Sequence, residues 1–272
     1  MKFDPASLRF DAQGLIPAIA QDIAQHAPVA APVISLQNGL NNVDTLRAAL
    51  PQRDVRAAMV PFNVVPNGKD GSAAWHRATS GDIVIQSGPG DLGSFLSAPG
   101  LGVVESDDIV AVQWGKLLLN LNNAINALSG LTLLEQLKSR DWRCLMADQM
   151  AEALAVLKAA QIRVTSTTPL PAWMGPHVLR LPTPLFTRVA AQMLTIDPMA
   201  RTSMAYDLAA GRKTEIDSLQ GEILTLAARH GMIAPLAQQI SNQIALATDT
   251  GITAPRLRPA DLRPPQRRYV SP

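Results

Sequence analysis

The stretch SDDIVAVQWGKLLLNLNN, residues 106–123, separates two halves of the 272-residue chain that are patterned differently. Short β-rich runs broken by Gly and Pro precede it, and helical patterns follow it. Ser106 is a candidate N-cap, with Asp107 and Asp108 in the first helical turn, where the helix dipole favours acidic side chains. The stretch therefore predicts the start of a helical half. A chain of this length also suits two domains of about 150 residues each.

The half before this stretch has the composition of an α/β domain. A short helical pattern runs from Asp44 to Leu50 and is closed by Pro51. Apolar runs with strand composition occupy residues 32–36, 55–65, 82–85 and 102–104. Strands that alternate with short helices predict an α/β layer, which we assign to residues 1–105.

The half after it reads as helical throughout, and we assign its domain to residues 106–254. A long apolar helix is followed by an amphipathic one over residues 133–162 and by a Pro-rich irregular connection over 169–184. Further helices are expected near residues 185–195, 199–211, 215–229 and 236–249. His230-Gly231 predicts a helix end, and Pro235 predicts a first helical position.

The last 18 residues, 255–272, form a basic, Pro-rich tail. They carry five arginines against Asp261, so the net charge of +2 belongs to this tail and not to the body. This composition predicts an extended or disordered, solvated terminus. Because the body has neither a basic stripe nor interleaved aromatic residues, we expect no nucleic-acid partner.

Several other classes of protein are excluded by pattern. The four histidines share no ligand spacing with the single cysteine, Cys144, so no metal site is expected. Walker and Gly-x-Ser-x-Gly motifs are absent from the sequence.

No run of 18 apolar residues exists, which predicts no membrane partner. The first residues lack a signal-peptide layout, and a lone cysteine cannot form an internal disulfide, so we expect a cytoplasmic protein.

Gly88-Pro89-Gly90-Asp91-Leu92-Gly93 matches the dinucleotide-binding fingerprint literally and follows a predicted strand. However, Asp91 would place a carboxylate beside the pyrophosphate, and Pro99 stops the following helix within two turns. We therefore interpret this segment as an ordinary strand-to-helix turn.

Lys116, Asn120 and Asn123 are spaced i, i+4 and i+7, so they share one face of the predicted long helix. Leucines surround them, and burying an ammonium and two amides without partners costs several kcal/mol. Something polar should therefore face them. The alternative is that Lys116 reaches the surface along its apolar stem and that the asparagines join helices together.

Other polar residues could complete such a site. Ser203 and Asp207 are spaced i, i+4 on a later helix, and Thr214 is a candidate cap of the next one. Glu215 is a candidate partner for Lys116, although its carboxylate could instead serve a helix N-terminus. Asn38, in Asn38-Gly39, follows a predicted strand, where open α/β sheets place ligands. A plain turn is the alternative there.

Three motifs, taken in order, resemble the ketopantoate reductases (2-dehydropantoate 2-reductases) over residues 13–250. They are Gln37-Asn38-Gly39, Trp114-Gly115-Lys116-Leu117-Leu118-Leu119-Asn120, and Ser203-Met204 followed by Asp207-Leu208 and Gly211-Arg212-Lys213-Thr214-Glu215-Ile216-Asp217. The resemblance implies a partial Rossmann-type dinucleotide-binding domain followed by an all-helical C-terminal domain, with the site in the cleft between them. It also implies NADPH-dependent reduction of 2-dehydropantoate, or a related 2-keto acid, to the 2-hydroxy acid, a step of pantothenate and coenzyme A biosynthesis.

The resemblance assigns roles by motif position. Lys116 matches the general acid, and Asn120 and Ser203 match residues that hold the substrate. Asn38 matches a residue that touches both cofactor and substrate. Glu215 matches an acid beside the cofactor and the catalytic lysine. A homodimer is left open.

The sequence departs from the family pattern in four respects. The family's Gly-x-Gly-x-x-Gly should precede Gln37 and is not there, and residues 1–12 do not resemble the family. Ala124 and Gln220 replace asparagines that many members have. We therefore expect an N-terminally truncated member that binds NADPH weakly, because backbone N–H groups of that loop supply much of the pyrophosphate affinity. The alternative is a non-catalytic remnant that serves as a helical binding or dimerisation module.

Overall fold

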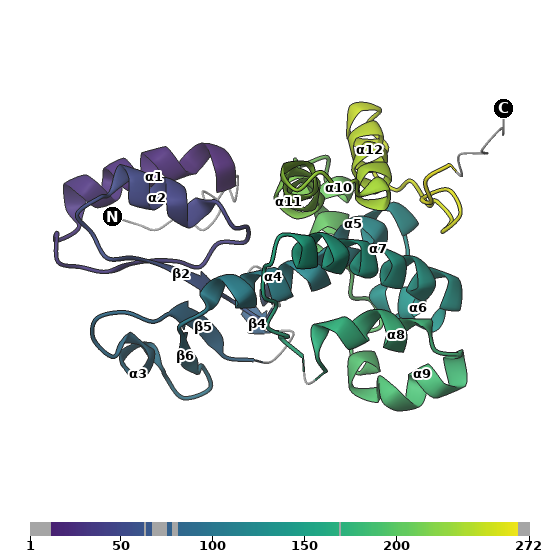
Figure 1. Cartoon of the computed structure of the whole chain (residues 1–272), viewed down its shortest axis with the longest axis horizontal. Coiled ribbons are helices and arrows are strands. Elements are labelled where there is room, and N and C mark those ends of the chain that lie inside the picture. The colour runs from purple at the N-terminus through teal and green to yellow at the C-terminus, as the bar shows by residue number, and fades with distance from the viewer. Residues whose placement is uncertain (1–11, 63, 67–74, 78–80, 169, 266–272) are drawn as a thin grey trace. The chain divides into compact units, whose positions relative to one another are not determined.

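The structure, a computed structural model, describes residues 12–62, 64–66, 75–77, 81–168 and 170–265 (Figure 1). The chain divides into two compact units, Met1–Gln113 and Trp114–Pro272, and each is described by itself. The division falls inside α4 (Ile109–Asn120), a few residues after the boundary at residue 106 expected from the sequence.

The first unit contains a mixed four-stranded sheet. Its strands lie in the order β1 (Val33–Ser35), β2 (Val55–Met59), β5 (Ile83–Gln86) and β6 (Val103–Ser106). The β1–β2 and β5–β6 pairs are parallel, and β2 is antiparallel to β5. β3 (Val64–Pro66) and β4 (Trp75–Arg77) form a separate antiparallel pair. The run 55–65 therefore holds two strands and not one, since Pro61 has no N–H to continue a ladder.

Helices cover both faces of this sheet because the side chains of β2 alternate between them. Val55, Ala57 and Met59 pack in one core with α1 (Ala12–His26) and α2 (Asn42–Ala49). Ala58 packs on the opposite face, in a core that Leu92 of α3 (Leu92–Leu96) adjoins. Figure 1 shows α1 and α2 on one side of the strands and α3 on the other. The unit is thus an α/β layered structure.

The second unit is helical, as the sequence predicts. After α4 come α5 (Asn122–Ser129), α6 (Leu133–Lys138), α7 (Arg140–Ala159), α8 (Gly175–Arg180), α9 (Thr183–Val189), α10 (Ser203–Ala209), α11 (Ile216–Arg229) and α12 (Pro235–Asp249). Two short 3₁₀ helices, η2 (Ala172–Met174) and η3 (Ala191–Leu194), lie on either side of α8 and α9.

Several predictions in this unit were wrong in detail. The helix expected near 185–195 is two elements, α9 and the separate 3₁₀ helix η3. The helix expected over 133–162 is interrupted at Ser139, whose backbone is extended at φ −84° and ψ 120°. The connection expected over 169–184 contains α8 and most of the first turn of α9. Each of these helices has a proline in its first turn, where the missing N–H costs nothing. Pro176 and Pro184, which were interpreted as parts of an irregular connection, instead lie in the first turns of α8 and α9.

The predicted helix end at His230-Gly231 and the predicted start at Pro235 were confirmed, whereas two predicted caps, Ser106 and Thr214, were wrong. α11 ends at Arg229, Gly231 follows with φ 65°, and α12 begins at Pro235. By contrast, Ser106 is the last residue of β6 and does not cap α4. The Asp108 carboxylate caps α4 instead, since it accepts a hydrogen bond from the Ala111 N–H at 3.3 Å. Thr214 does not cap α11 either, because Glu215 holds the N-cap position.

The basic tail is anchored as far as the structure describes it. Leu262 is 0% exposed, and the Leu257 N–H donates to the Leu128 carbonyl at 2.9 Å. Arg263 also pairs with Asp148 at 2.7 Å. The expected solvated terminus was therefore wrong for residues 255–265, because leucines between the arginines supply apolar surface to bury. Arg267 and Arg268 lie outside the described residues.

Among the described residues, we find no helix whose length and apolarity would let it cross a bilayer.

Candidate active site

Lys116 lies half-buried on α4, between the glycine and the buried leucine that precede and follow it. Burial lowers the pKa of the Lys116 ammonium, and the nearby charge of Glu215 acts in the opposite direction and raises it. The burial effect is the larger of the two, so the pKa of Lys116 is lowered. A lysine that fully reached solvent would show no such shift. Lys116 is therefore a partly desolvated cation with a carboxylate near it.

A hydrogen bond ties α11, which begins just after Glu215, to the end of α4, which carries Lys116. The fully buried Gln220 on α11 donates through Nε2 to the carbonyl of Leu121, which separates α4 from α5, at 2.9 Å. Lys116 precedes Leu121 by five residues, and Glu215 precedes Gln220 by five. At a helical rise of about 1.5 Å per residue, each charge lies roughly 7.5 Å along its helix from this bond. The bond thus ties α11 to the end of α4, at points five residues beyond Glu215 and Lys116.

Glu215 occupies the N-cap position of α11, yet its side chain makes no capping hydrogen bond. Its charge acts instead on Lys116. Of the two interpretations of Glu215 left open by the sequence, the lack of a capping bond and the electrostatic effect on Lys116 support the partner of Lys116 over the cap.

Ser203, the first residue of α10, is exposed, and its neighbour Thr202 is held firmly against α5. The Thr202 N–H donates to Asn126 Oδ1 at 3.1 Å, and its hydroxyl donates to the Asn123 carbonyl at 3.1 Å. These two bonds place Ser203 beside the start of α5. Asn120, one turn after Lys116, lies half-buried at the end of α4.

Asp207 lies on the same face of α10 as Ser203, and both its carboxylate and its carbonyl bond to Arg212. Its carboxylate pairs with the Arg212 guanidinium at 2.7 Å, and its carbonyl accepts from the Arg212 N–H at 2.8 Å. This clamp closes the turn at Gly211, which has φ 64°.

Asn126 is a positioning residue that the sequence analysis did not identify. Its buried amide donates to the Leu131 carbonyl and to Gln136 Oε1 at 3.1 and 3.0 Å, besides accepting from Thr202. The signal was present, since Asn122 and Asn126 are spaced i, i+4 within an apolar helix. A buried amide in such a helix requires partners from other elements.

Asn38 belongs to the first unit, where it is exposed in a bend directly after β1. Its carbonyl accepts from Asn42 Nδ2 at 2.7 Å, and Gly39 follows with φ 94°. The residue therefore stands at the carboxyl end of a parallel strand, as the sequence predicts.

The Gly88–Gly93 segment has carboxylates where a pyrophosphate would need free N–H groups. Asp91 accepts from the Ser94 N–H at 3.1 Å, and Glu105 Oε1 accepts from the Gly93 N–H at 2.9 Å. Bound carboxylates repel a second anion from a helix N-terminus. The helix that follows, α3, has only five residues. This geometry supports the interpretation of an ordinary strand-to-helix turn.

Comparison with known proteins shows which family has these features. The family model "Ketopantoate reductase PanE/ApbA C terminal" matches residues 108–256, and the model "Ketopantoate reductase PanE/ApbA" matches residues 12–90. A short stretch of 24 residues, 9% of this chain, is 83% identical to the phosphoribosyl-AMP cyclohydrolase of Dinoroseobacter shibae. The chain spans only 20% of that curated protein, so this match carries no argument about activity.

Solved structures resemble the chain over most of its length. A PanE/ApbA family ketopantoate reductase from Ralstonia eutropha is 26% identical with a TM-score of 0.69, over 88% of this chain and 74% of that one. A D-mandelate dehydrogenase bound to NADH and anilino(oxo)acetate is 20% identical with a TM-score of 0.68, over 87% and 74%. A dimeric ketopantoate reductase from Staphylococcus aureus is 17% identical with a TM-score of 0.65, over 88% and 75%.

These matches agree with the architecture described above, an α/β unit with a mixed sheet followed by a helical unit. The last two relatives support the fold alone, because their identity to this chain is low. The C-terminal family model spans more than half of the chain and includes Lys116, Asn120, Ser203 and Glu215. The chain belongs to the PanE/ApbA family of ketopantoate reductases.

Proposed function

We propose that this chain reduces 2-dehydropantoate, or a related 2-keto acid, with NADPH and that Lys116 is the general acid. The observation that carries the proposal is the half-buried Lys116 ammonium, whose pKa is lowered by burial and which has Glu215 close enough to act on it. A perturbed titratable group of this kind is typical of catalytic sites.

The side chains have the chemistry that such a reduction needs. When bound, the nicotinamide supplies a hydride to the keto carbon. Negative charge then develops on the keto oxygen, where the Lys116 ammonium stabilises it and donates a proton. Because burial lowers the pKa of Lys116, the proton leaves more readily than from an exposed lysine. Glu215 limits that shift and so keeps Lys116 charged until the proton is transferred.

Asn120 and Ser203 suit the binding of a small hydroxy-keto acid. An amide and a hydroxyl form hydrogen bonds to a substrate carboxylate or hydroxyl without adding charge near Lys116. Asn120 follows Lys116 by one helical turn, and Ser203 starts a helix that Thr202 anchors to α5. We assign both residues to the substrate.

The described residues suit the nicotinamide end of the cofactor and not its pyrophosphate. Asn38 and Glu215 are the proposed contacts at the nicotinamide end. At the Gly-rich match, Gly88–Gly93, the N–H groups of Gly93 and Ser94 at the start of α3 are bound by Glu105 and Asp91. We therefore expect NADPH to bind this chain more weakly than micromolar. Calorimetry that gave a micromolar dissociation constant would contradict this and would direct attention back to the Gly88–Gly93 turn.

Steady-state kinetics at millimolar NADPH test the proposal directly, with 2-dehydropantoate and phenylglyoxylate as alternative substrates. We expect turnover of at least one, and a loss of 10²–10⁴-fold in kcat for Lys116→Ala, the usual range for general acid catalysis. Lys158→Ala, an exposed lysine on α7, is the matched control. Ser203→Ala should lower kcat less and raise KM.

Two results would reject this function. If the folded Lys116→Ala variant kept its parental kcat, the proton would come from another group. If the parental chain turned over neither substrate, the alternative of a helical binding or dimerisation module would replace the reductase.

We also propose a homodimer. The Staphylococcus aureus relative is a dimeric ketopantoate reductase. Light scattering should then give twice the chain mass of 29.0 kDa. A mass equal to one chain at micromolar concentration would reject the dimer.

A further inference from the structure

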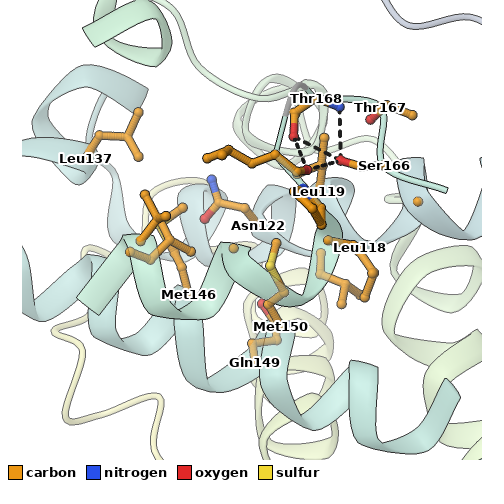
Figure 2. A pocket seen from close by; sticks show the side chains of 18 of the residues that line it. Leu118, Leu119, Asn122, Leu137, Met146, Gln149, Met150, Ser166, Thr167 and Thr168 are labelled. Carbon is orange, nitrogen blue, oxygen red and sulfur yellow. Dashed lines mark hydrogen bonds between the residues drawn. The ribbon is translucent and has the colours of Figure 1, made fainter. Parts of the chain in front are cut away.

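A cavity of about 260 Å³ lies within the helical unit (Figure 2). By helical spacing, its lining positions on α4 lie on a different face from Lys116. Gly115, Leu118, Leu119 and Asn122 line it, and these positions recur at helical spacing along one stripe of α4 and the start of α5. Neither Lys116 nor Asn120 is among the lining residues. The cavity is therefore separate from the candidate active site, although the same helix forms part of both.

The walls of this cavity are almost entirely apolar. α6, α7 and α8 contribute leucine, methionine and valine side chains, including Leu137, Met146 and Val178. Ser166 and Thr168 also line it, but their hydroxyls bond to one another at 3.0 Å and to the Leu170 carbonyl, as the dashed lines in Figure 2 show. Because these hydroxyls are hydrogen-bonded within their own segment, they do not need a polar ligand as a partner.

Two carboxamides line the cavity, and only one of them is satisfied. Asn122 exchanges hydrogen bonds with Gln136, at 3.3 Å as donor and 3.0 Å as acceptor. Gln149 on α7 is 2% exposed, and its Nε2 has no hydrogen-bond partner among the described residues. A buried N–H group without an acceptor is unfavourable and rare in folded proteins. Gln149 thus marks a place in the cavity wall where an acceptor would be stabilising.

We propose that this cavity is a second binding site, for a neutral and largely apolar small molecule that carries one hydrogen-bond acceptor for Gln149. No charged side chain is among the described residues that line the cavity, so a charged ligand would lose its hydration without compensation. An engineered apolar cavity of about 150 Å³ binds benzene, so 260 Å³ holds roughly ten non-hydrogen atoms. An aromatic ketone has this size and this single acceptor.

Methionine methyl NMR tests the site with two probes of nearly the same shape, acetophenone and isopropylbenzene. Only acetophenone has the acceptor. Met146 and Met150 line the cavity and report binding there, while Met204, buried on α10, reports binding elsewhere. We expect acetophenone to shift the Met146 and Met150 signals and to bind about three- to tenfold more tightly than isopropylbenzene, the range of one net hydrogen bond.

Variants separate the acceptor from the apolar cavity. In Gln149→Leu the two probes should bind equally, whereas Gln238→Leu, an exposed control, should keep the preference for acetophenone. Ala172→Phe places a ring in the cavity and should abolish binding of both probes. It keeps the proposal testable if Gln149→Leu does not fold.

Three results would overturn the proposal. They are no shift of Met146 or Met150 with either probe, equal affinities of the two probes for the parental chain, and shifts confined to methionines outside the cavity. Because acetophenone lacks the carboxylate of a 2-keto acid, failure here would leave the reductase proposal untouched.

Discussion

Two cations of the helical unit, the fully buried Arg143 and the half-buried Lys116, differ in what surrounds them. Arg143 is 0% exposed, and its guanidinium donates to the carbonyls of Leu179, Leu137 and Leu181 at 3.2, 2.8 and 2.9 Å. It also stacks 4.2 Å from the centre of the Phe186 ring. These carbonyls stand at or just beyond the last turns of α6 and α8, the negative ends of those helices. Arg143 therefore joins helices. Burial lowers the pKa of both cations, and Lys116 differs in having the charge of Glu215 near it.

Lys116→Met should abolish activity and raise the melting temperature. Methionine has nearly the shape of the lysine stem and removes an ammonium that burial disfavours. The loss in kcat should again be about 10²–10⁴-fold. Kinetics and thermal unfolding measure the two effects, and Lys158→Met should change neither. A lower melting temperature for Lys116→Met would mean that the ammonium is a structural group.

The same pKa shift predicts how stability depends on pH. Between the lowered pKa of folded Lys116 and the ordinary value of 10.5, the unfolded chain binds more protons than the folded one. The free energy of unfolding that Lys116 contributes therefore rises as the pH rises through this window. Urea unfolding at about pH 8 and pH 10 should show this rise in the parental chain relative to Lys116→Met. Parallel values for the two proteins would contradict the burial of the ammonium.

At the scale of elements, the Gln220–Leu121 bond fixes α11 to the junction of α4 and α5. Gln220→Leu should lower the free energy of unfolding by about 1–3 kcal/mol, because the Leu121 carbonyl loses its donor. The variant should also weaken the effect of Glu215, so the pKa of Lys116 should fall further. A general acid must be protonated, so the basic limb of the kcat profile should move to lower pH. A purely structural role would lower stability and leave that limb in place.

Periodicity and composition predicted most elements, and the failures have local causes. The strand and helix patterns around β1, β5, α11 and α12 needed no tertiary information, because their ends carry Gly or Pro signals. The helix that ends at Ser139 starts with a capping box. There the Thr132 hydroxyl accepts from the Glu135 N–H, and the Glu135 carboxylate accepts from the Thr132 N–H. Thr-x-x-Glu was visible in the sequence, but it marks a start and says nothing of where the helix stops.

The candidate site was predicted in part for a similar reason. Lys116 and Asn120 share a helix, so their common face follows from spacing alone. The Gln220–Leu121 bond, which ties α11 to the end of α4, joins residues 99 positions apart, and no local pattern encodes it. α1 was likewise missed, since Pro17 lies inside it and prolines usually interrupt helices.

At the scale of the whole molecule, the tail contributes to the helical unit as a buried segment. Leu262 is fully buried, and Asp148 pairs with both Arg263 and Arg180, each at 2.7 Å. Leu262→Ala should lower the free energy of unfolding by about 2–5 kcal/mol, the usual range for a leucine deleted from a core. Leu257→Ala, at a less buried position of the same segment, is the control. Urea unfolding measures both, and equal small losses would mean that the tail does not pack as described.

The Leu257 N–H bond to Leu128 gives this segment a property that neither its composition nor its lack of regular structure suggests. An amide in an unstructured terminus exchanges its proton with solvent within seconds, whereas one held by a packed partner exchanges only when the segment detaches. The Leu257 amide should thus be protected from exchange with deuterium. Its exchange rate should measure how often residues 255–265 detach from the helical unit. Since the Arg263–Asp148 pair is partly exposed, added salt should weaken it and speed that detachment.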